Sequence, residues 1–215
     1  MRNALLPRKA PLQARARASY EAILEAATQI IASRGLAGFN TNAVAERAGV
    51  SIGSLYQYFP NKDALMVALI RQQQERQGAA VRAAVEATGT KASLEFVVRT
   101  IIRAAMRNHY DNELLAAAID HEEARLPIKD RLDDYLASLG ADLAGFLRRF
   151  SSEIRPEAVE RGARTLPALV RGVVDAWADL APAQLDIAEE EAVAAVLGYL
   201  RGGPGTTAKA TAQNS

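Results

Sequence analysis

The sequence predicts an all-α protein, and three observations lead to this prediction. Alanine is abundant and only 6% of the 215 residues are aromatic, a composition that favours helix over sheet. Apolar residues recur at helical spacing from one end of the chain to the other. No segment shows the strict alternation of apolar and polar residues that indicates a half-buried strand.

The first clear helix ends at Gly35, because a glycine can adopt the left-handed conformation that closes a helix. Its apolar face carries Ile23, Leu24, Ala27, Ile30 and Ile31. A short second helix, capped by either Asn40 or Thr41, stops at Gly49.

Ser51 is expected to cap a third helix over about residues 52–59. Pro60 and Asn61 break the chain and begin a long fourth helix that continues to Gly89. The remaining helices are expected over about residues 92–110, 112–124, 127–151, 156–179 and 187–201. Pro167 lies inside the apolar stripe of the fourth of these and predicts a kink or a break there.

Composition excludes several classes of function. The chain has no cysteine, which excludes disulfides, thiolate catalysis and cysteine-ligated metals. No run approaches the roughly 18 apolar residues of a membrane span. The N-terminus is basic but has no continuous apolar segment, so we expect no secretory signal and a cytoplasmic protein.

Charge is unevenly distributed, although the net charge is only +1. Residues 1–62 carry eight basic and three acidic side chains, and the remainder carries 18 basic and 22 acidic ones. A basic front on a mildly acidic body suggests contact with a polyanion. A solubilising N-terminal segment explains the same charges equally well.

The stretch Gly49-Val50-Ser51-Ile52-Gly53 matches G-x-S-x-G, the pattern of the nucleophile elbow in serine hydrolases. That elbow needs a strand before the serine, and the residues before Ser51 have a helical pattern. A helix-turn-helix accounts for each residue instead: Gly49 permits the tight turn, Val50 fills the angle between the helices and Ser51 caps the second helix. That second helix would lie in the DNA major groove.

The segment TNAVAERAGVSIGSLYQYFPNKDAL, preceded by the amphipathic ASYEAILEAATQIIASRG, closely resembles the DNA-binding domain of the TetR (tetracycline repressor-like) transcriptional regulators. The resemblance covers about residues 15–70. It implies an all-α homodimer with an N-terminal three-helix DNA-binding domain and a C-terminal helical domain for ligand binding and dimerisation. It also implies a repressor that binds a palindromic operator in double-stranded DNA and leaves it when a small-molecule effector binds.

With this resemblance, the chain is expected to divide into five parts. A basic flexible arm occupies residues 1–14 and the helix-turn-helix domain residues 15–62. A linking helix covers about 61–88, within a ligand-binding and dimerisation domain over 63–201. A disordered tail is expected over 202–215.

The resemblance implies DNA contacts for five residues. Thr41 matches a phosphate-contacting threonine, and Asn42 matches a position where some members read bases. Tyr56 and Tyr58 match the tyrosines of LYxYF, and Lys62 matches the lysine of the N-K pair. Thr41 can instead be a simple cap, and the tyrosine rings can instead be partly core.

The other expected DNA contacts follow from side-chain chemistry on and beside the recognition helix. Ile52 can touch a thymine methyl group, and Gln57 can pair with adenine. Gly53 lets the backbone approach the DNA closely. The remaining candidates are Arg47, Ser51 and Ser54.

The sequence of the C-terminal half gives less information about the ligand pocket. The resemblance places a pocket among the helices between about 91 and 179, and no cofactor other than an unidentified small-molecule effector is expected. The candidates to line the pocket are Phe96, Arg103, Met106, His109, Tyr110, Tyr135 and Trp177. His121 has no second histidine at helical spacing, so no metal site is expected. Two further hypotheses stay open on the residues alone: a serine hydrolase that uses Ser51, and a helical adaptor that does not bind DNA.

Overall fold

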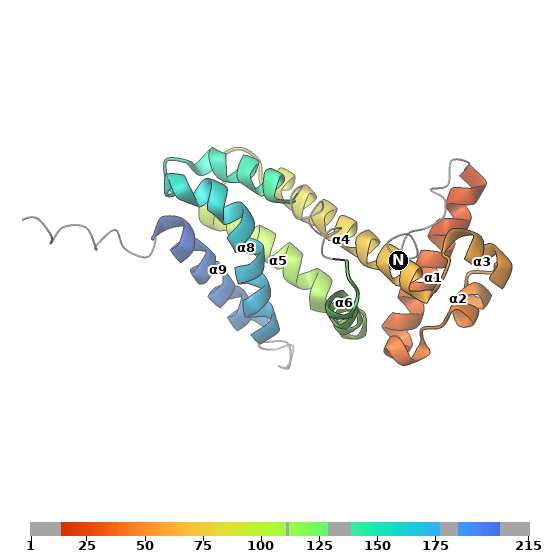
Figure 1. The fold of residues 1–215 in the computed structure, drawn as a ribbon. Helices are drawn as coiled ribbons and strands as arrows, with labels where there is room; N and C mark the ends of the chain where they lie inside the picture. Colours follow the sequence, from red (N-terminus) through yellow and green to blue (C-terminus); the bar gives the residue numbers. More distant parts are fainter. Residues whose placement is uncertain (1–13, 111, 129–138, 177–184, 203–215) are drawn as a thin grey trace, which may run out of the picture. The chain divides into compact units, whose positions relative to one another are not determined.

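A computed structural model describes residues 14–110, 112–128, 139–176 and 185–202. These residues contain helices and no strand, which confirms the predicted all-α class (Figure 1). The helices are α1 (Ala14–Gly38), α2 (Thr41–Arg47), α3 (Ile52–Tyr58), α4 (Lys62–Ala87), α5 (Leu94–Tyr110), α6 (Glu113–Arg125), α8 (Pro156–Ala176) and α9 (Leu185–Arg201). Residues 139–147 are also helical and lead into a short 3-10 helix, η2 (Arg148–Phe150).

The chain forms two compact units. The first takes in Met1–Gln77 and Asn108–Leu132, and the second takes in Gly78–Arg107 and Asp133–Ser215. Helices α4 and α5 each contribute to both units.

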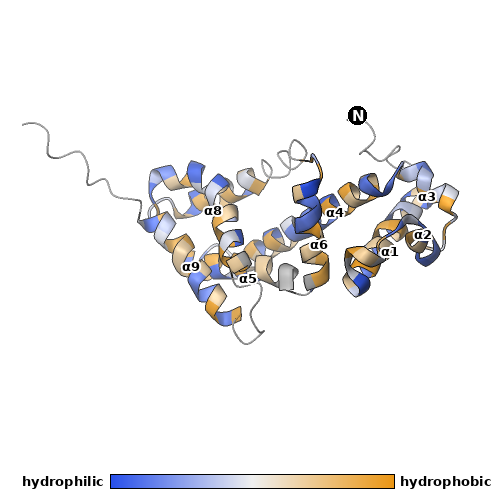
Figure 2. Cartoon of the chain, turned by 60° about the horizontal axis from the view of Figure 1, so that its bottom comes forward, coloured by the Kyte–Doolittle hydropathy of each residue, from blue (hydrophilic) through white to orange (hydrophobic). Residues whose placement is uncertain are grey.

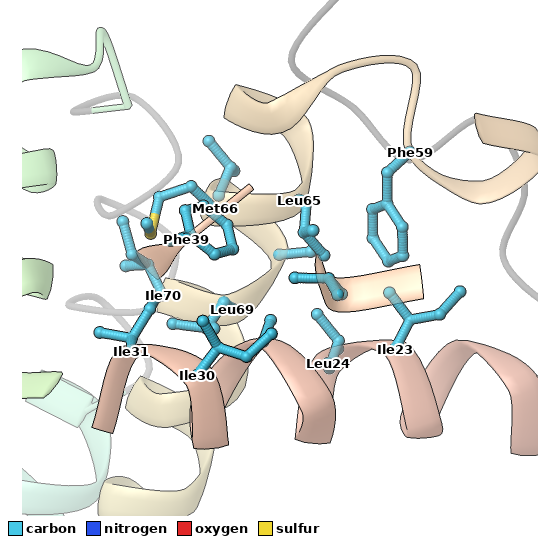
Figure 3. Close-up of a cluster of buried hydrophobic side chains, with 14 of the residues drawn as sticks. Ile23, Leu24, Ile30, Ile31, Phe39, Phe59, Leu65, Met66, Leu69 and Ile70 are labelled. Atoms are coloured by element: carbon cyan, nitrogen blue, oxygen red, sulfur yellow. The ribbon is translucent and has the colours of Figure 1, made fainter. Parts of the chain in front are cut away.

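The core of the first unit lies between α1 and the first half of α4 (Figure 3). Helical spacing puts the apolar residues of each helix on one face, and burial of such a side chain stabilises the fold by about 1.5–3 kcal/mol. Phe39 and Phe59 come from the segments that follow α1 and α3; Phe39 lies beside Met66, and Phe59 lies on the side of the core near Ile23. The most deeply buried side chains include Ile23, Ile31, Leu55, Leu65, Met66, Leu69 and Ile70.

Gly35 interrupts α1 as the sequence predicts. Its backbone has φ 60° and ψ −166°, which is outside the helical region and is accessible mainly to glycine. The chain resumes a short helical stretch to Gly38 and then enters the extended residue Asn40.

Helix α6 belongs to the first unit, where it packs against α1. Asn112 caps it by accepting a hydrogen bond from the N–H of Leu115 at 3.0 Å. At its other end Arg125 donates to Glu122 at 2.6 Å and to Asp63, at the start of α4, at 2.5 Å. These two carboxylates raise the pKa of Arg125 and tie the end of α6 to the beginning of α4.

The second unit is built around the packing of α8 against α9. Both helices alternate between hydrophobic and hydrophilic residues along their length (Figure 2). Helix α8 runs from Pro156 to Ala176 without a break, so Pro167 does not end the helix. Of the expected 127–151 helix, residues 127–128 are described and are not helical, residues 129–138 lie outside the described residues, and residues 139–147 are helical.

An ion-pair network joins α5 to α9 within the second unit. Arg99 donates to Glu189 at 3.1 Å and also bonds Glu190, and Arg103 donates to Glu189 at 2.7 Å. Glu189 is only 8% exposed, so two arginines compensate one buried carboxylate. The hydrogen bond from Arg99 lowers the pKa of Glu190.

The described residues offer neither a membrane span nor a metal site. No helix in this part of the chain is long and apolar enough to cross a membrane. Within the same residues, no three histidine, cysteine or acidic side chains gather in a way that could hold a metal ion.

Candidate nucleic-acid interface

The interface begins where Asn40 starts α2. Its side-chain oxygen accepts the N–H of Ala43 at 2.9 Å, and its backbone is extended, as an N-cap requires. The sequence left Asn40 and Thr41 as alternatives for this cap. Because Asn40 takes the role, the Thr41 hydroxyl stands at the first helical position and is available for another contact.

The turn between α2 and α3 is closed by backbone hydrogen bonds. The N–H of Gly49 donates to Glu46 at 3.1 Å, and that of Val50 donates to Ala45 at 3.0 Å. This pair of bonds is the Schellman motif, which needs a left-handed residue just after the helix. Gly49 supplies it with φ 66°.

Ser51 caps α3, as the sequence predicts. Its hydroxyl oxygen accepts the N–H of Ser54 at 3.0 Å and lies 2.8 Å from the Ser54 hydroxyl. Helix α2 and a tight turn, not a strand, precede it. The geometry is therefore that of a helix-turn-helix and not that of a nucleophile elbow.

Helix α3 has a buried face and an exposed face. Leu55 and the following Phe59 are fully buried in the first unit's core. On its exposed face Ile52 is 39% exposed and Tyr56, one turn later, is 40% exposed. Ser51, Gly53 and Gln57 are also exposed, and Ser54 and Tyr58 are half-buried.

Two hydroxyl groups meet at the edge of this exposed face. The Thr41 hydroxyl at the start of α2 lies 3.1 Å from the Tyr56 hydroxyl on α3. Both groups are on the surface, and Asn42 beside them is exposed. Paired hydroxyls at a helix N-terminus suit a phosphate oxygen, which can accept a hydrogen bond from each.

The two predicted basic contacts, Arg47 and Lys62, both have neighbours on the protein. The exposed Arg47 donates from its Nε atom to the side-chain oxygen of Gln29 on α1 at 2.8 Å. The Lys62 ammonium group lies 5.1 Å from the centre of the Phe39 ring. A cation over an aromatic face keeps its charge, so Lys62 can still neutralise a phosphate at the surface.

Tyr58 is divided between core and surface. Its ring meets the ring of Tyr20 edge-on, with centroids 6.1 Å apart, and Tyr20 in turn stacks on Phe59 at 5.0 Å. Burial raises the pKa of Tyr20. These rings attach the first turns of α1 to the end of α3, so Tyr58 packs as well as facing the surface.

Comparison with known protein families decides what this helix-turn-helix belongs to. Residues 23–69 match the family of bacterial regulatory proteins described as the tetR family. Residues 93–200 match the tetracyclin repressor-like C-terminal domain. The chain belongs to the TetR family. TetR-family proteins are transcriptional regulators and not enzymes, so the serine hydrolase hypothesis for Ser51 is set aside.

Named relatives agree with this family. The chain is 37% identical over 103 residues to the HTH-type transcriptional repressor KstR of Mycolicibacterium smegmatis, a match over 47% of this chain and 50% of that protein. It is 35% identical over 97 residues to KstR of Mycobacterium tuberculosis, over 45% of this chain and 44% of that protein. The matched segment spans about half the length of these curated relatives.

Solved structures share the fold. A regulator from Rhodococcus sp. RHA1 is 25% identical, with a TM-score of 0.59 over 84% of this chain and 94% of that chain. A regulator from Shewanella sp. PV-4 is 21% identical, with a TM-score of 0.64 over 85% of this chain and 97% of that chain. The multidrug binding protein EbrR, solved with imidazole, is 22% identical, with a TM-score of 0.59 over 86% of this chain and 91% of that chain.

The predicted pocket residues fall in different environments. On α5, Met106 is buried, Phe96 is 56% exposed, and Arg103 is exposed and bonded to Glu189. The side chains of His109 and Tyr110, and the whole of Tyr135 and Trp177, lie outside the described residues.

Sequence reasoning missed one residue beside the interface, Gln29. It accepts from Arg47 and donates to Glu25 at 3.1 Å, so it links α2 to the polar face of α1. The four-residue spacing of Glu25 and Gln29 is a helical signal that could have indicated this pair. The contact with Arg47 depends on how α1 and α2 cross, which the sequence does not encode locally.

Proposed function

We propose that this chain is a ligand-responsive transcriptional repressor that binds palindromic operator DNA as a homodimer in the cytoplasm and is released by a small-molecule effector. The observation that carries the proposal is the exposed face of α3, held at a fixed angle to α2 by the Asn40 cap, the Gly49 turn and the Ser51 cap. The two KstR relatives are named as repressors, which supports repression as the direction of control.

Phosphate contacts position the protein in this account. The Thr41 and Tyr56 hydroxyls, 3.1 Å apart, together bind one phosphate group, and Lys62 neutralises a second at the start of α4. Because each neutralised phosphate releases counterions, DNA affinity falls as salt rises.

Dimerisation supplies the two-fold symmetry that a palindrome requires. Helices α8 and α9 pack together in the second unit, and both leave apolar side chains partly uncovered. The half-buried or exposed apolar residues include Val159, Leu169, Val170, Val173, Ile187 and Leu197. A second copy of the chain packed on this face would cover them and place two recognition helices about 34 Å apart in successive major grooves.

The effector acts by shifting a population. It stabilises a conformer in which the two DNA-binding units no longer match the half-site spacing, so the ligand and the operator bind different conformers. Met106, buried on α5, is a described residue suited to line an apolar pocket, and EbrR with imidazole is a neighbour of the same fold with a bound small molecule.

A salt titration on a duplex of mixed sequence tests the DNA contacts, so the operator need not be identified first. The purified chain is titrated into the fluorescently labelled duplex at several salt concentrations, and anisotropy gives the affinity. Wild type is expected to bind at low salt and to weaken steeply as salt rises. Tyr56→Phe combined with Lys62→Ala should bind more weakly, with a salt slope smaller by about two, one for the Lys62 of each protomer.

Lys91→Ala serves as the matched control, because Lys91 is an exposed lysine between α4 and α5, outside the helix-turn-helix. It should leave both the affinity and the salt slope near the wild-type values. A folded wild-type protein that binds no duplex at low salt would contradict the proposal and favour the adaptor hypothesis. Equal loss in the Lys91→Ala variant would contradict the assignment of Lys62.

A further inference from the structure

The exposed face of α3 carries no charged side chain. The helix reads Ile-Gly-Ser-Leu-Tyr-Gln-Tyr, and its two large exposed apolar residues are Ile52 and Tyr56. Ile52 is the first residue of the helix, and in a helix-turn-helix the N-terminal residues of the recognition helix face the base edges. A branched aliphatic side chain therefore stands where a base contact is made.

Guanine is usually read by an arginine or lysine that bonds O6 and N7 together. The two basic residues closest to α3 in sequence each contact the protein: the Arg47 Nε donates to Gln29 at 2.8 Å, and the Lys62 ammonium lies 5.1 Å from the centre of the Phe39 ring. Neither belongs to α3 itself. Base reading from α3 then falls to apolar and amide groups.

Ser51 and Ser54 are less available for contacts with bases, because both hydroxyls make hydrogen bonds within the protein. The Ser51 oxygen caps the helix, and the Ser51 and Ser54 hydroxyls lie 2.8 Å apart, bonded to each other. Each hydroxyl has part of its hydrogen-bonding capacity committed within the protein. Ile52 and Gln57, both exposed on α3, are therefore the side chains that remain to distinguish one base pair from another.

Gly53 follows Ile52 and has no structural need to be glycine. A methyl group built on it would meet only the Ser51 hydroxyl, at 3.8 Å, which is an ordinary contact. Its φ is not in the left-handed region. The missing side chain leaves room for the α3 backbone to come close to a surface outside the protein, which brings Ile52 within reach of a methyl group there.

We infer that α3 reads A·T base pairs, with Ile52 packed against the 5-methyl group of a thymine in each half-site and Gln57 bonded to an adenine. This inference rests on the proposed function, since it concerns the sequence that the same interface selects. The 5-methyl group of thymine is the apolar feature of the major groove, and an amide side chain pairs with adenine N6 and N7.

The test starts from binding sites selected out of a random duplex pool by the wild-type protein. Each thymine of the enriched site is then replaced by uracil, which removes only the 5-methyl group. Loss of one buried methyl contact should weaken wild-type binding about fourfold, or roughly sixteenfold when both half-sites are changed. Ile52→Ala should bind the thymine and uracil duplexes equally.

Two further variants keep the result interpretable. Leu114→Ala removes a residue that is 49% exposed on α6 in the same unit, and it should keep the full wild-type sensitivity to uracil. Ile52→Val retains a branched side chain and should keep part of that sensitivity, which guards against a general loss of folding in Ile52→Ala.

The possible outcomes distinguish a failure of A·T reading from a failure of DNA binding itself. Enriched sites whose fixed base pairs are G·C, or wild-type binding that is indifferent to uracil at every position, would overturn the inference and leave DNA binding intact. No enrichment by a folded protein that also binds no duplex at low salt would overturn the proposed function and the inference together.

Discussion

Replacing Gly53 by alanine should make the protein more stable and its DNA complex weaker. Gly53 lies in the first turn of α3, is exposed, and has ordinary space for a methyl group, with the Ser51 hydroxyl 3.8 Å away. Alanine is better than glycine within a helix by about 0.5–1 kcal/mol, and the first turn puts this site at the lower end of that range. The free energy of unfolding should therefore rise by about 0.5 kcal/mol.

The DNA complex should respond in the opposite direction. If the α3 backbone approaches base edges closely at Gly53, an added methyl group has to be accommodated in a packed interface, which costs about 1–3 kcal/mol. That cost corresponds to affinity weaker by about 5- to 150-fold for each half-site of the operator. Denaturant unfolding gives the first quantity, and anisotropy with a selected duplex gives the second.

Gly145→Ala is the matched control for this pair of measurements. Gly145 is also helical and exposed, with nothing within 4 Å of an added methyl group, but it belongs to the second unit. It should gain similar stability and keep wild-type DNA affinity. Unchanged affinity in Gly53→Ala would refute the close approach of α3 to DNA, and a loss of stability would refute the described space around Gly53.

Three further changes test the caps, the core and the ion pairs. Ser51→Ala should cost about 1 kcal/mol of stability in denaturant unfolding, because the N–H of Ser54 loses its acceptor; no change would mean that the cap is dispensable. Leu24→Ala, at a site 2% exposed, should cost about 2–5 kcal/mol, and a loss below about 1 kcal/mol would contradict the described core. Because the bond from Arg99 lowers the pKa of Glu190, its contribution is present at neutral pH and is lost as pH falls below the ordinary value of 4.5. Glu190→Gln should therefore have a lower urea midpoint than wild type at neutral pH and the same midpoint in strong acid; a pH-independent difference would contradict the ion pair.

Features that depend on a few neighbouring residues could be predicted from the sequence. Gly35 and Ser51 are two such cases, because a left-handed glycine ends a helix and a serine caps one whatever the surrounding fold. The choice between Asn40 and Thr41 could not be made in this way, since both residue types cap helices. In the structure Asn40 caps α2, and the Thr41 hydroxyl lies beside the Tyr56 hydroxyl instead. The contact between Thr41 and Tyr56 depends on how α2 and α3 cross.

Pro167 shows the limit of a local rule. A proline removes one helical hydrogen bond, which predicts a kink or a break; there is no break, because α8 continues through Pro167 to Ala176. The cost of the lost hydrogen bond is offset where tertiary packing holds both halves of a helix, and α8 packs against α9. Such packing is not visible in the spacing of residues along one helix.

The helix-turn-helix was more predictable from the sequence than the surroundings of the candidate pocket residues, for a physical reason. DNA presents the same phosphates and groove to every helix-turn-helix, so the residues that meet it recur at fixed places in a short motif. A pocket has no such common partner. Phe96, a candidate to line the pocket, is 56% exposed on α5, whereas Met106 further along the same helix is buried.

The absence of cysteine from the chain permits a direct test of where α3 lies on DNA. A single cysteine introduced at Gln57, which is exposed on α3, can carry an iron chelate that cleaves DNA locally, and cutting is measured at a concentration at which anisotropy shows that the conjugate occupies the selected duplex. Ala124, exposed on α6, provides the control, because α6 and α3 lie on opposite sides of α1 (Figures 1 and 2). On a selected duplex the Gln57→Cys conjugate should cut two clusters of bases, related by two-fold symmetry and about one helical turn apart. Diffuse cutting, or the same clusters from the Ala124→Cys conjugate, would contradict the account in which α3 reads the DNA.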